Sequence, residues 1–71
     1  PMMPLSLARP GEPGTIRRVA GRDETRRRLA ELGFVAESTV TVVSRLAGSL
    51  ILQVKDSRVA LDRDLAGRIL V

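Results

Sequence analysis

The residues of this sequence best suited to chemistry are three consecutive arginines, Arg26, Arg27 and Arg28, followed closely by the only aromatic residue, Phe34. Guanidinium groups bind carboxylates and phosphates through two parallel hydrogen bonds, so this segment suits recognition of an anionic partner. Histidine, cysteine and tyrosine are absent, and with them the usual general bases, thiol nucleophiles and imidazole ligands. We therefore expect a protein that acts by binding and is not an enzyme.

Two carboxylate pairs could suggest a metal site, Asp62 with Asp64 and Asp23 with Glu24. Carboxylates without imidazole make a poor site for Fe²⁺, which usually recruits histidine. Asp62 is better explained as a helix N-cap and Asp64 as an acid in the first helical turn. We expect no catalytic residue, no metal site and no bound cofactor.

A short helix over residues 24–32 carries the arginines. Asp23 is expected to cap it, and Gly33 to end it, because glycine adopts the left-handed conformation without a Cβ clash. The side chains spaced i, i+4 and i+7 are expected to form its buried stripe: Thr25, Leu29 and Leu32.

The rest of the chain divides into strand-sized pieces. The Pro-Gly pair at 10–11 predicts a type II turn, and the spacing of Leu50, Leu52 and Val54 predicts one buried face of a strand. The expected strands cover 15–19, 39–45, 50–54, 58–61 and 68–71, with a helical turn over 63–66. One helix after the first strand and a helical turn before the last predict a mainly β, SH3-like barrel of about five strands, as a single domain over residues 1–71.

Composition agrees with a small globular domain. The chain has 71 residues, 44% of them hydrophobic, and a net charge of +4. The arginine bias has two explanations, genome composition or recognition of phosphate or carboxylate. The longest aliphatic run, Leu50-Ile51-Leu52, is too short to span a bilayer, and the first residues lack the features of a secretory signal. We expect a cytoplasmic protein without direct membrane insertion.

Four ordered blocks resemble the FeoA family, the small cytosolic partners of the FeoB ferrous iron transporter. They are the entry 7–11 ending in Pro-Gly, the helix end at 27–29 and 32–34, the strand 40–43, and the C-terminal block 57–71. The resemblance implies an SH3-like barrel in iron homeostasis that binds the cytosolic GTPase part of a FeoB-type transporter without catalysis. Many members have a longer loop where this chain has residues 46–49.

The partner-binding candidates are Arg26, Arg27, Arg28, Leu32, Gly33 and Phe34. The opposing interpretation is that the arginines form a solvated face, with i to i+4 pairs from Asp23 and Glu24, and that Phe34 is a core residue. A partly exposed Phe34 would instead join the arginines in a contact surface.

Two other kinds of partner remain open. An arginine-rich barrel could bind nucleic acid, although single-strand binders stack bases on aromatic side chains and Phe34 is the only aromatic. A small aliphatic barrel could also form a homo-oligomer through exposed strand or helix faces.

Overall fold

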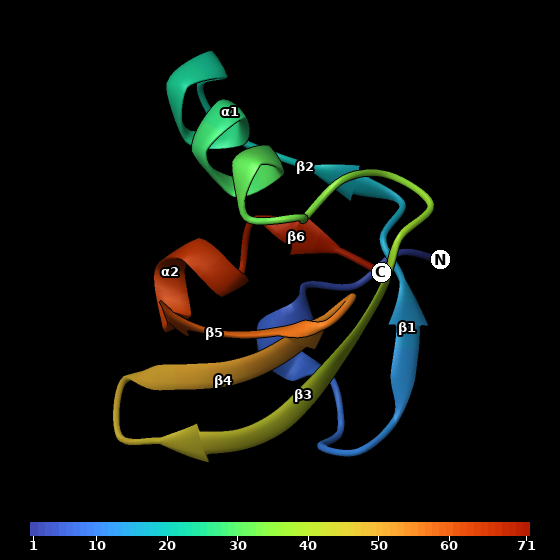
Figure 1. Cartoon of the computed structure of the whole chain (residues 1–71), viewed down its shortest axis with the longest axis vertical. Coiled ribbons are helices and arrows are strands. Elements are labelled where there is room, and N and C mark those ends of the chain that lie inside the picture. Colours follow the sequence, from blue (N-terminus) through green and yellow to red (C-terminus); the bar gives the residue numbers. More distant parts are fainter.

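The computed structural model describes residues 1–71 as two β-sheets with a separate helix at one end (Figure 1). The elements are η1 (Leu5–Leu7), β1 (Pro13–Thr15), β2 (Arg18–Val19), α1 (Asp23–Glu31), β3 (Thr39–Leu46), β4 (Ser49–Val54), β5 (Ser57–Asp62), α2 (Arg63–Ala66) and β6 (Ile69–Leu70). The prediction of a mainly β, SH3-like fold is confirmed, with six strands where about five were expected. Neither helix is long and apolar enough to cross a membrane.

The larger sheet has the strand order β1-β3-β4-β5, with every neighbouring pair antiparallel. Strand β4 alternates between half-buried and buried side chains, because successive residues of a strand point to opposite faces. Its three buried residues are those expected, Leu50, Leu52 and Val54. The turn after β4 consists of Lys55 and Asp56, so β5 runs back along β4 in unbroken register from Val54↔Ser57 to Ser49↔Asp62.

The smaller sheet pairs β2 with β6. The segment expected as one strand over 15–19 is in fact two strands, because the chain leaves the larger sheet after Thr15 and enters the smaller one at Arg18. Ile16 lies at this corner, fully buried, and its N–H donates to the carbonyl of Ser38 at 2.9 Å. The hydrogen-bonded strands therefore form two sheets that share one core, and not a single closed barrel.

The two ends of the fold meet beside β6. The N–H of Met3 donates to the carbonyl of Val71, and the N–H of Val71 to the carbonyl of Met3, both at 2.9 Å. Pro4 forms a further bridge with Leu70. Figure 1 shows the N- and C-termini side by side.

A single hydrophobic core joins the two sheets. It contains thirteen buried residues, all apolar, and no buried polar side chain: Leu5, Ala8, Ile16, Leu29, Phe34, Val40, Val42, Leu50, Leu52, Val54, Leu61, Ala66 and Ile69. Aliphatic burial of this kind is the main source of stability in a domain that has no cysteine.

Candidate protein-binding surface at helix α1

Helix α1 begins one residue earlier than predicted, at Asp23. The prediction that Asp23 is the N-cap was wrong: the cap position belongs to Arg22, which makes no side-chain capping hydrogen bond. Asp23 and Glu24 instead lie in the first turn, where a negative charge is favoured by the helix dipole. Asp62 does act as a cap, since its Oδ1 accepts a hydrogen bond from the N–H of Leu65 at 2.8 Å.

The C-terminal end of α1 is fixed by glycine, as expected. Gly33 has a φ of +105°, a left-handed conformation that other residues adopt only with strain. The chain then turns back, and the N–H of Phe34 donates to the carbonyl of Leu29 at 2.9 Å. This return places Phe34 in the core, with 1% of its surface exposed.

The burial of Phe34 corrects the candidate site. A side chain that is 1% exposed cannot form part of a contact surface, so Phe34 is a core residue. Leu32 is the opposite case: it was expected in the buried stripe of α1, and it is 45% exposed. Of that stripe only Leu29 is buried, Thr25 is half-buried, and Leu32 is free to contact a partner.

The three consecutive arginines of α1 have different surroundings. Arg26 forms an ion pair with Asp23, one turn earlier on the helix. The expected pairs of Asp23 with Arg27 and of Glu24 with Arg28 are not formed, and the pair of Asp23 with Arg26 is the only ion pair in the structure. Arg27 and Arg28 are exposed and have no ion pair.

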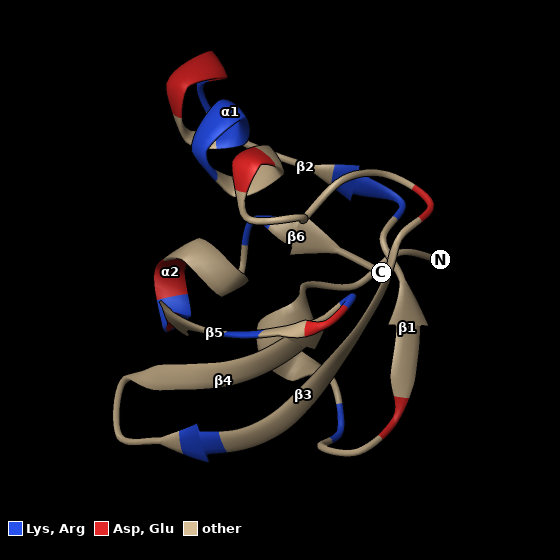
Figure 2. Ribbon diagram, in the orientation of Figure 1, with Lys and Arg blue, Asp and Glu red and all other residues tan.

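Further arginines lie at the same end of the molecule, which we call the basic end. The side chain of Arg68 extends over Gly21, where an added Cβ would come within 3.1 Å of its Cδ. Figure 2 shows positive segments on α1, on β2 and immediately before β6. Six arginines of the basic end have neither an ion pair nor a side-chain hydrogen bond: Arg17, Arg18, Arg22, Arg27, Arg28 and Arg68.

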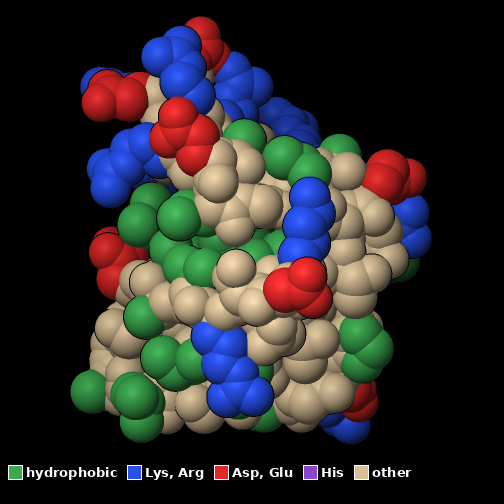
Figure 3. Space-filling view, viewed as in Figure 1, with side chains coloured by type: hydrophobic (Ala, Val, Ile, Leu, Met, Phe, Trp, Pro, Cys, Tyr) green, Lys and Arg blue, Asp and Glu red, His purple; other side chains and the backbone are tan.

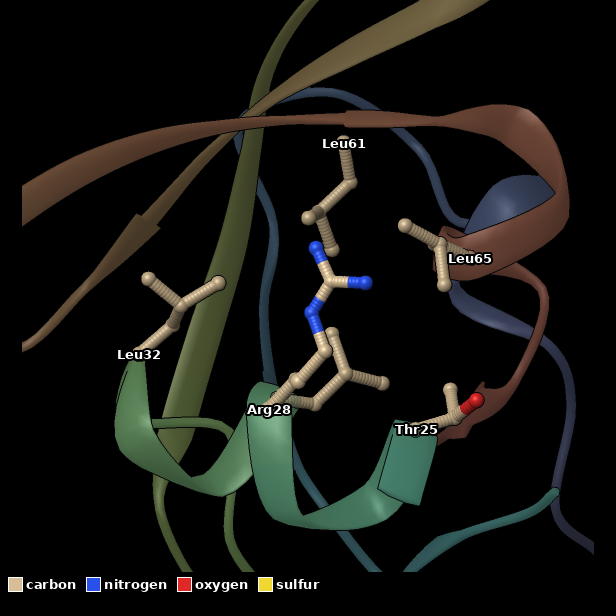
Figure 4. Close-up of a pocket in the computed structure, with 6 residues that line it drawn as sticks. Thr25, Arg28, Leu32, Leu61 and Leu65 are labelled. Carbon is tan, nitrogen blue, oxygen red and sulfur yellow. The ribbon is translucent and has the colours of Figure 1, made fainter. Parts of the chain in front are cut away.

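An apolar cleft lies between α1, β5 and α2. Its volume is about 70 Å³, and six residues line it: Thr25, Arg28, Leu29, Leu32, Leu61 and Leu65. In the close-up, Leu61 points from β5 toward α1, and the guanidinium of Arg28 extends into the space between them (Figure 4). Figure 3 shows hydrophobic side chains gathered in the hollow below α1, with both Lys or Arg and Asp or Glu side chains around the helix.

The structure therefore brings together part of the predicted site. Arg28 and Leu32 line the cleft, while Arg26 and Arg27 lie on α1 outside its lining, and Gly33 is half-buried. The sequence analysis missed Leu61 and Leu65, which come from the other end of the chain. Both are apolar, on β5 and α2, and only the fold places them opposite α1.

The side chains of this surface suit the recognition of a partner. It offers unpaired guanidinium groups beside exposed leucine, and no group of three or more His, Cys, Asp or Glu side chains comes together that could hold a metal ion. Asp62, half of the carboxylate pair considered above, is engaged in capping α2.

The chain matches the model of the FeoA domain over residues 3–71. Among solved structures, it resembles a crystal structure of an iron uptake regulatory protein, FeoA, at 32% identity, covering 99% of this chain and 95% of that one with a TM-score of 0.89. FeoA of Stenotrophomonas maltophilia, described as an SH3-domain protein complexed with zinc, is 31% identical over 92% of this chain and 84% of its own, with a TM-score of 0.80.

The same fold occurs inside longer proteins. A manganese-dependent transcriptional repressor superposes with a TM-score of 0.91 at 26% identity, and the match covers all of this chain but 36% of the repressor. No curated protein sequence gives a significant match.

Proposed function

The chain belongs to the FeoA family, which has a role in ferrous iron transport, and on this premise we propose that it is an accessory protein that binds the cytosolic GTPase part of a FeoB-type membrane transporter. It acts there through protein–protein contacts in the cytoplasm and carries out no reaction of its own. The solved relative from Stenotrophomonas maltophilia was itself suggested to be a ferrous iron transport activating factor.

The observation that carries the proposal is the composition of the surface at α1. Leu32 is 45% exposed and adjoins the cleft, and the neighbouring Arg27 and Arg28 have no ion pair. Arginine is enriched at protein interfaces, and the burial of exposed leucine on binding is favourable. An apolar hollow that is lined by the unpaired Arg28 fits a partner surface that offers an apolar side chain and a carboxylate.

The regulatory effect would arise from a difference in affinity. A bound protein shifts a conformational equilibrium only as far as it prefers one state over the other. We therefore expect the affinity for the GTPase part to differ between its GDP-bound and GTP-bound states.

The nucleic-acid alternative lacks a surface on which bases could stack. Binders of single strands stack bases on exposed aromatic side chains, and the only aromatic residue here, Phe34, is buried. The unpaired arginines alone would give a salt-sensitive attraction to phosphates, without a stacking platform.

The test is binding to the purified cytosolic GTPase domain of the transporter from the same organism, with GDP and with a GTP analogue, at two salt concentrations. Arg27→Glu reverses a charge on α1 and is expected to weaken binding, with a larger effect at low salt. Arg9→Glu is the matched control, because Arg9 is exposed on the loop between η1 and β1, at the opposite end of the fold from α1 (Figure 1).

Equal weakening by both variants would show that only the overall charge matters and would contradict a binding surface at α1. The absence of binding in either nucleotide state would contradict the proposed function itself.

A further inference from the structure

Strand β5 has an open edge. It lies last in the order β1-β3-β4-β5 and pairs with β4 alone. In an antiparallel pair joined by a two-residue turn, the two residues that flank the turn exchange backbone hydrogen bonds. The next pair of opposite residues exchanges none, the pair after it does, and this alternation continues along the strands. By this alternation, Val54↔Ser57 and Leu52↔Val59 are hydrogen-bonded, whereas Arg58 and Ala60 direct their N–H and C=O groups away from β4.

Nothing in the protein uses these outward backbone groups. The hydrogen bonds made outside the regular elements include none from or to the backbone of Arg58 or Ala60. Edge strands are usually protected by charged side chains, by proline, by a bulge or by a short length. Strand β5 has two exposed charged residues, Arg58 and Asp62, and none of the other devices. Strand β5 has six residues, no proline and no register shift against β4, whereas β1, at the other edge, has three residues and begins with Pro13.

The open edge runs beside the apolar cleft. Leu61 belongs to β5 and lines the cleft together with Leu32 of the α1 end and Leu65 of α2. The guanidinium of Arg28 extends into this space and has no ion pair or hydrogen bond (Figure 4). Backbone donors and acceptors, an apolar hollow and a free cation are thus adjacent.

We propose that β5 is a docking edge for an extended peptide segment of a partner protein, which adds to the sheet as a further strand, places an apolar side chain in the cleft and pairs a carboxylate with Arg28. Strand addition of this kind takes its affinity from main-chain hydrogen bonds and its specificity from pockets for alternate side chains. The carboxylate follows from charge complementarity, because the cleft presents an unpaired guanidinium and the chain has a net charge of +4. That the segment belongs to the transporter rests on the proposed function.

The direct test uses a capped synthetic peptide about eight residues long in which valine or leucine alternates with glutamate, a length typical of strands. We expect the peptide to slow hydrogen exchange at the amides of Arg58 and Ala60 and to shift the NMR signals of Leu61 and Leu65. The same peptide with lysine in place of glutamate is expected to bind at least about tenfold more weakly.

Two substitutions separate backbone pairing from charge. Ala60→Pro removes an N–H that bonds nothing in the free protein, in a position where edge strands tolerate proline, and is expected to weaken binding about tenfold. Ala60→Thr, which keeps the N–H, is the matched control and retains binding. Arg28→Glu is expected to reverse the preference between the glutamate and lysine peptides. Thermal unfolding of each variant verifies that it folds.

A glutamate peptide that binds elsewhere, or that binds Ala60→Pro as well as Ala60→Thr, would overturn the proposal. So would the absence of exchange protection at Arg58 and Ala60 with peptide in excess.

Hydrogen exchange in the complex with the transporter's GTPase domain separates this proposal from the proposed function. A complex that forms without protecting β5 would leave the proposed function standing and exclude the docking edge as its contact. Peptide binding at β5 without a complex would refute the transporter partner and retain the edge as a peptide-binding site.

Discussion

Strand β4 and helix α1 differ in how they are attached to the molecule. Strand β4 lies between two neighbouring strands, and three of its six residues are buried. Helix α1 has nine residues, of which only Leu29 is buried, and glycines with positive φ, Gly21 and Gly33, flank it on both sides. The strands therefore contribute most of the buried side chains that stabilise the fold. Helix α1 contributes few of them and leaves most of its side chains exposed.

This contrast explains why α1 and the residue after it can carry unpaired arginines and the exposed Leu32. Residues of β4 that point inward must be apolar, because an unpaired charge in the core is costly. The other residues of α1 are not buried, so their side chains can be charged and can contact a partner. The difference between the two regions can be measured with matched substitutions.

The largest expected effect comes from leucines in the two regions. Leu52 of β4 is fully buried, and Leu52→Ala should lower the free energy of unfolding by about 2–5 kcal/mol, because the lost methyl groups leave a cavity. Leu32→Ala removes the same atoms from a side chain that is 45% exposed, and should change stability by no more than about 0.5 kcal/mol. Urea unfolding of both variants measures the difference. Similar losses would refute the division between a structural sheet and a surface helix.

A middle-sized effect is expected where α1 ends. Gly33→Ala should lower the free energy of unfolding by about 1 kcal/mol, because alanine is strained at a φ of +105°. The added Cβ would lie 3.5 Å from Val54, an ordinary contact, so the cost comes from the backbone. Gly48→Ala is the control, since nothing lies within 4 Å and its φ is not left-handed. Thermal unfolding that ranks Gly48→Ala as the more damaging change would contradict this account.

Effects of about 1 kcal/mol and below are expected for two aspartates at helix starts. Asp62→Ala removes the cap of α2 and should cost about 1 kcal/mol. Asp23→Ala removes only the exposed pair with Arg26 and a first-turn charge, and should cost about 0.5 kcal/mol or less. In high salt the Asp23 effect should vanish, because salt screens an exposed ion pair. Most of the Asp62 effect should persist, because it comes from the hydrogen bond that Oδ1 accepts from the N–H of Leu65 at 2.8 Å. Denaturation of both variants at two salt concentrations measures the difference; an Asp62 effect that vanished together with the Asp23 effect would contradict the capping role.

Local patterns in the sequence predicted the parts of the fold that local chemistry determines. The alternation of Leu50, Leu52 and Val54 predicted a strand face, and each of the three is buried. The left-handed conformation of Gly33 and the cap at Asp62 were predicted for the same reason, since each depends on residues that are close in sequence.

The predictions were wrong where a residue's conformation or burial depends on residues far away in the sequence. The segment over 15–19 was expected to be one strand, but the chain passes from one sheet to the other at Ile16. Leu32 follows the helical spacing of Leu29 but comes after the last residue of α1, where no neighbouring element covers it. Phe34 was left open between core and contact, and the turn at Gly33 directs it inward.

The candidate site shows the same limit. Its arginines could be identified from sequence, whereas the cleft depends on the approach of β5 and α2 to α1. The open edge of β5 is a property of strand order, which no local pattern contains.

The reciprocal hydrogen bonds between Met3 and Val71 have a consequence for protein architecture. A polypeptide enters and leaves this fold at one point, so the module can be appended to another protein, or inserted in it, without stretching either connection. The manganese-dependent repressor, in which an equivalent unit makes up 36% of the chain, is an instance of such reuse. In any such arrangement the junction adjoins β6.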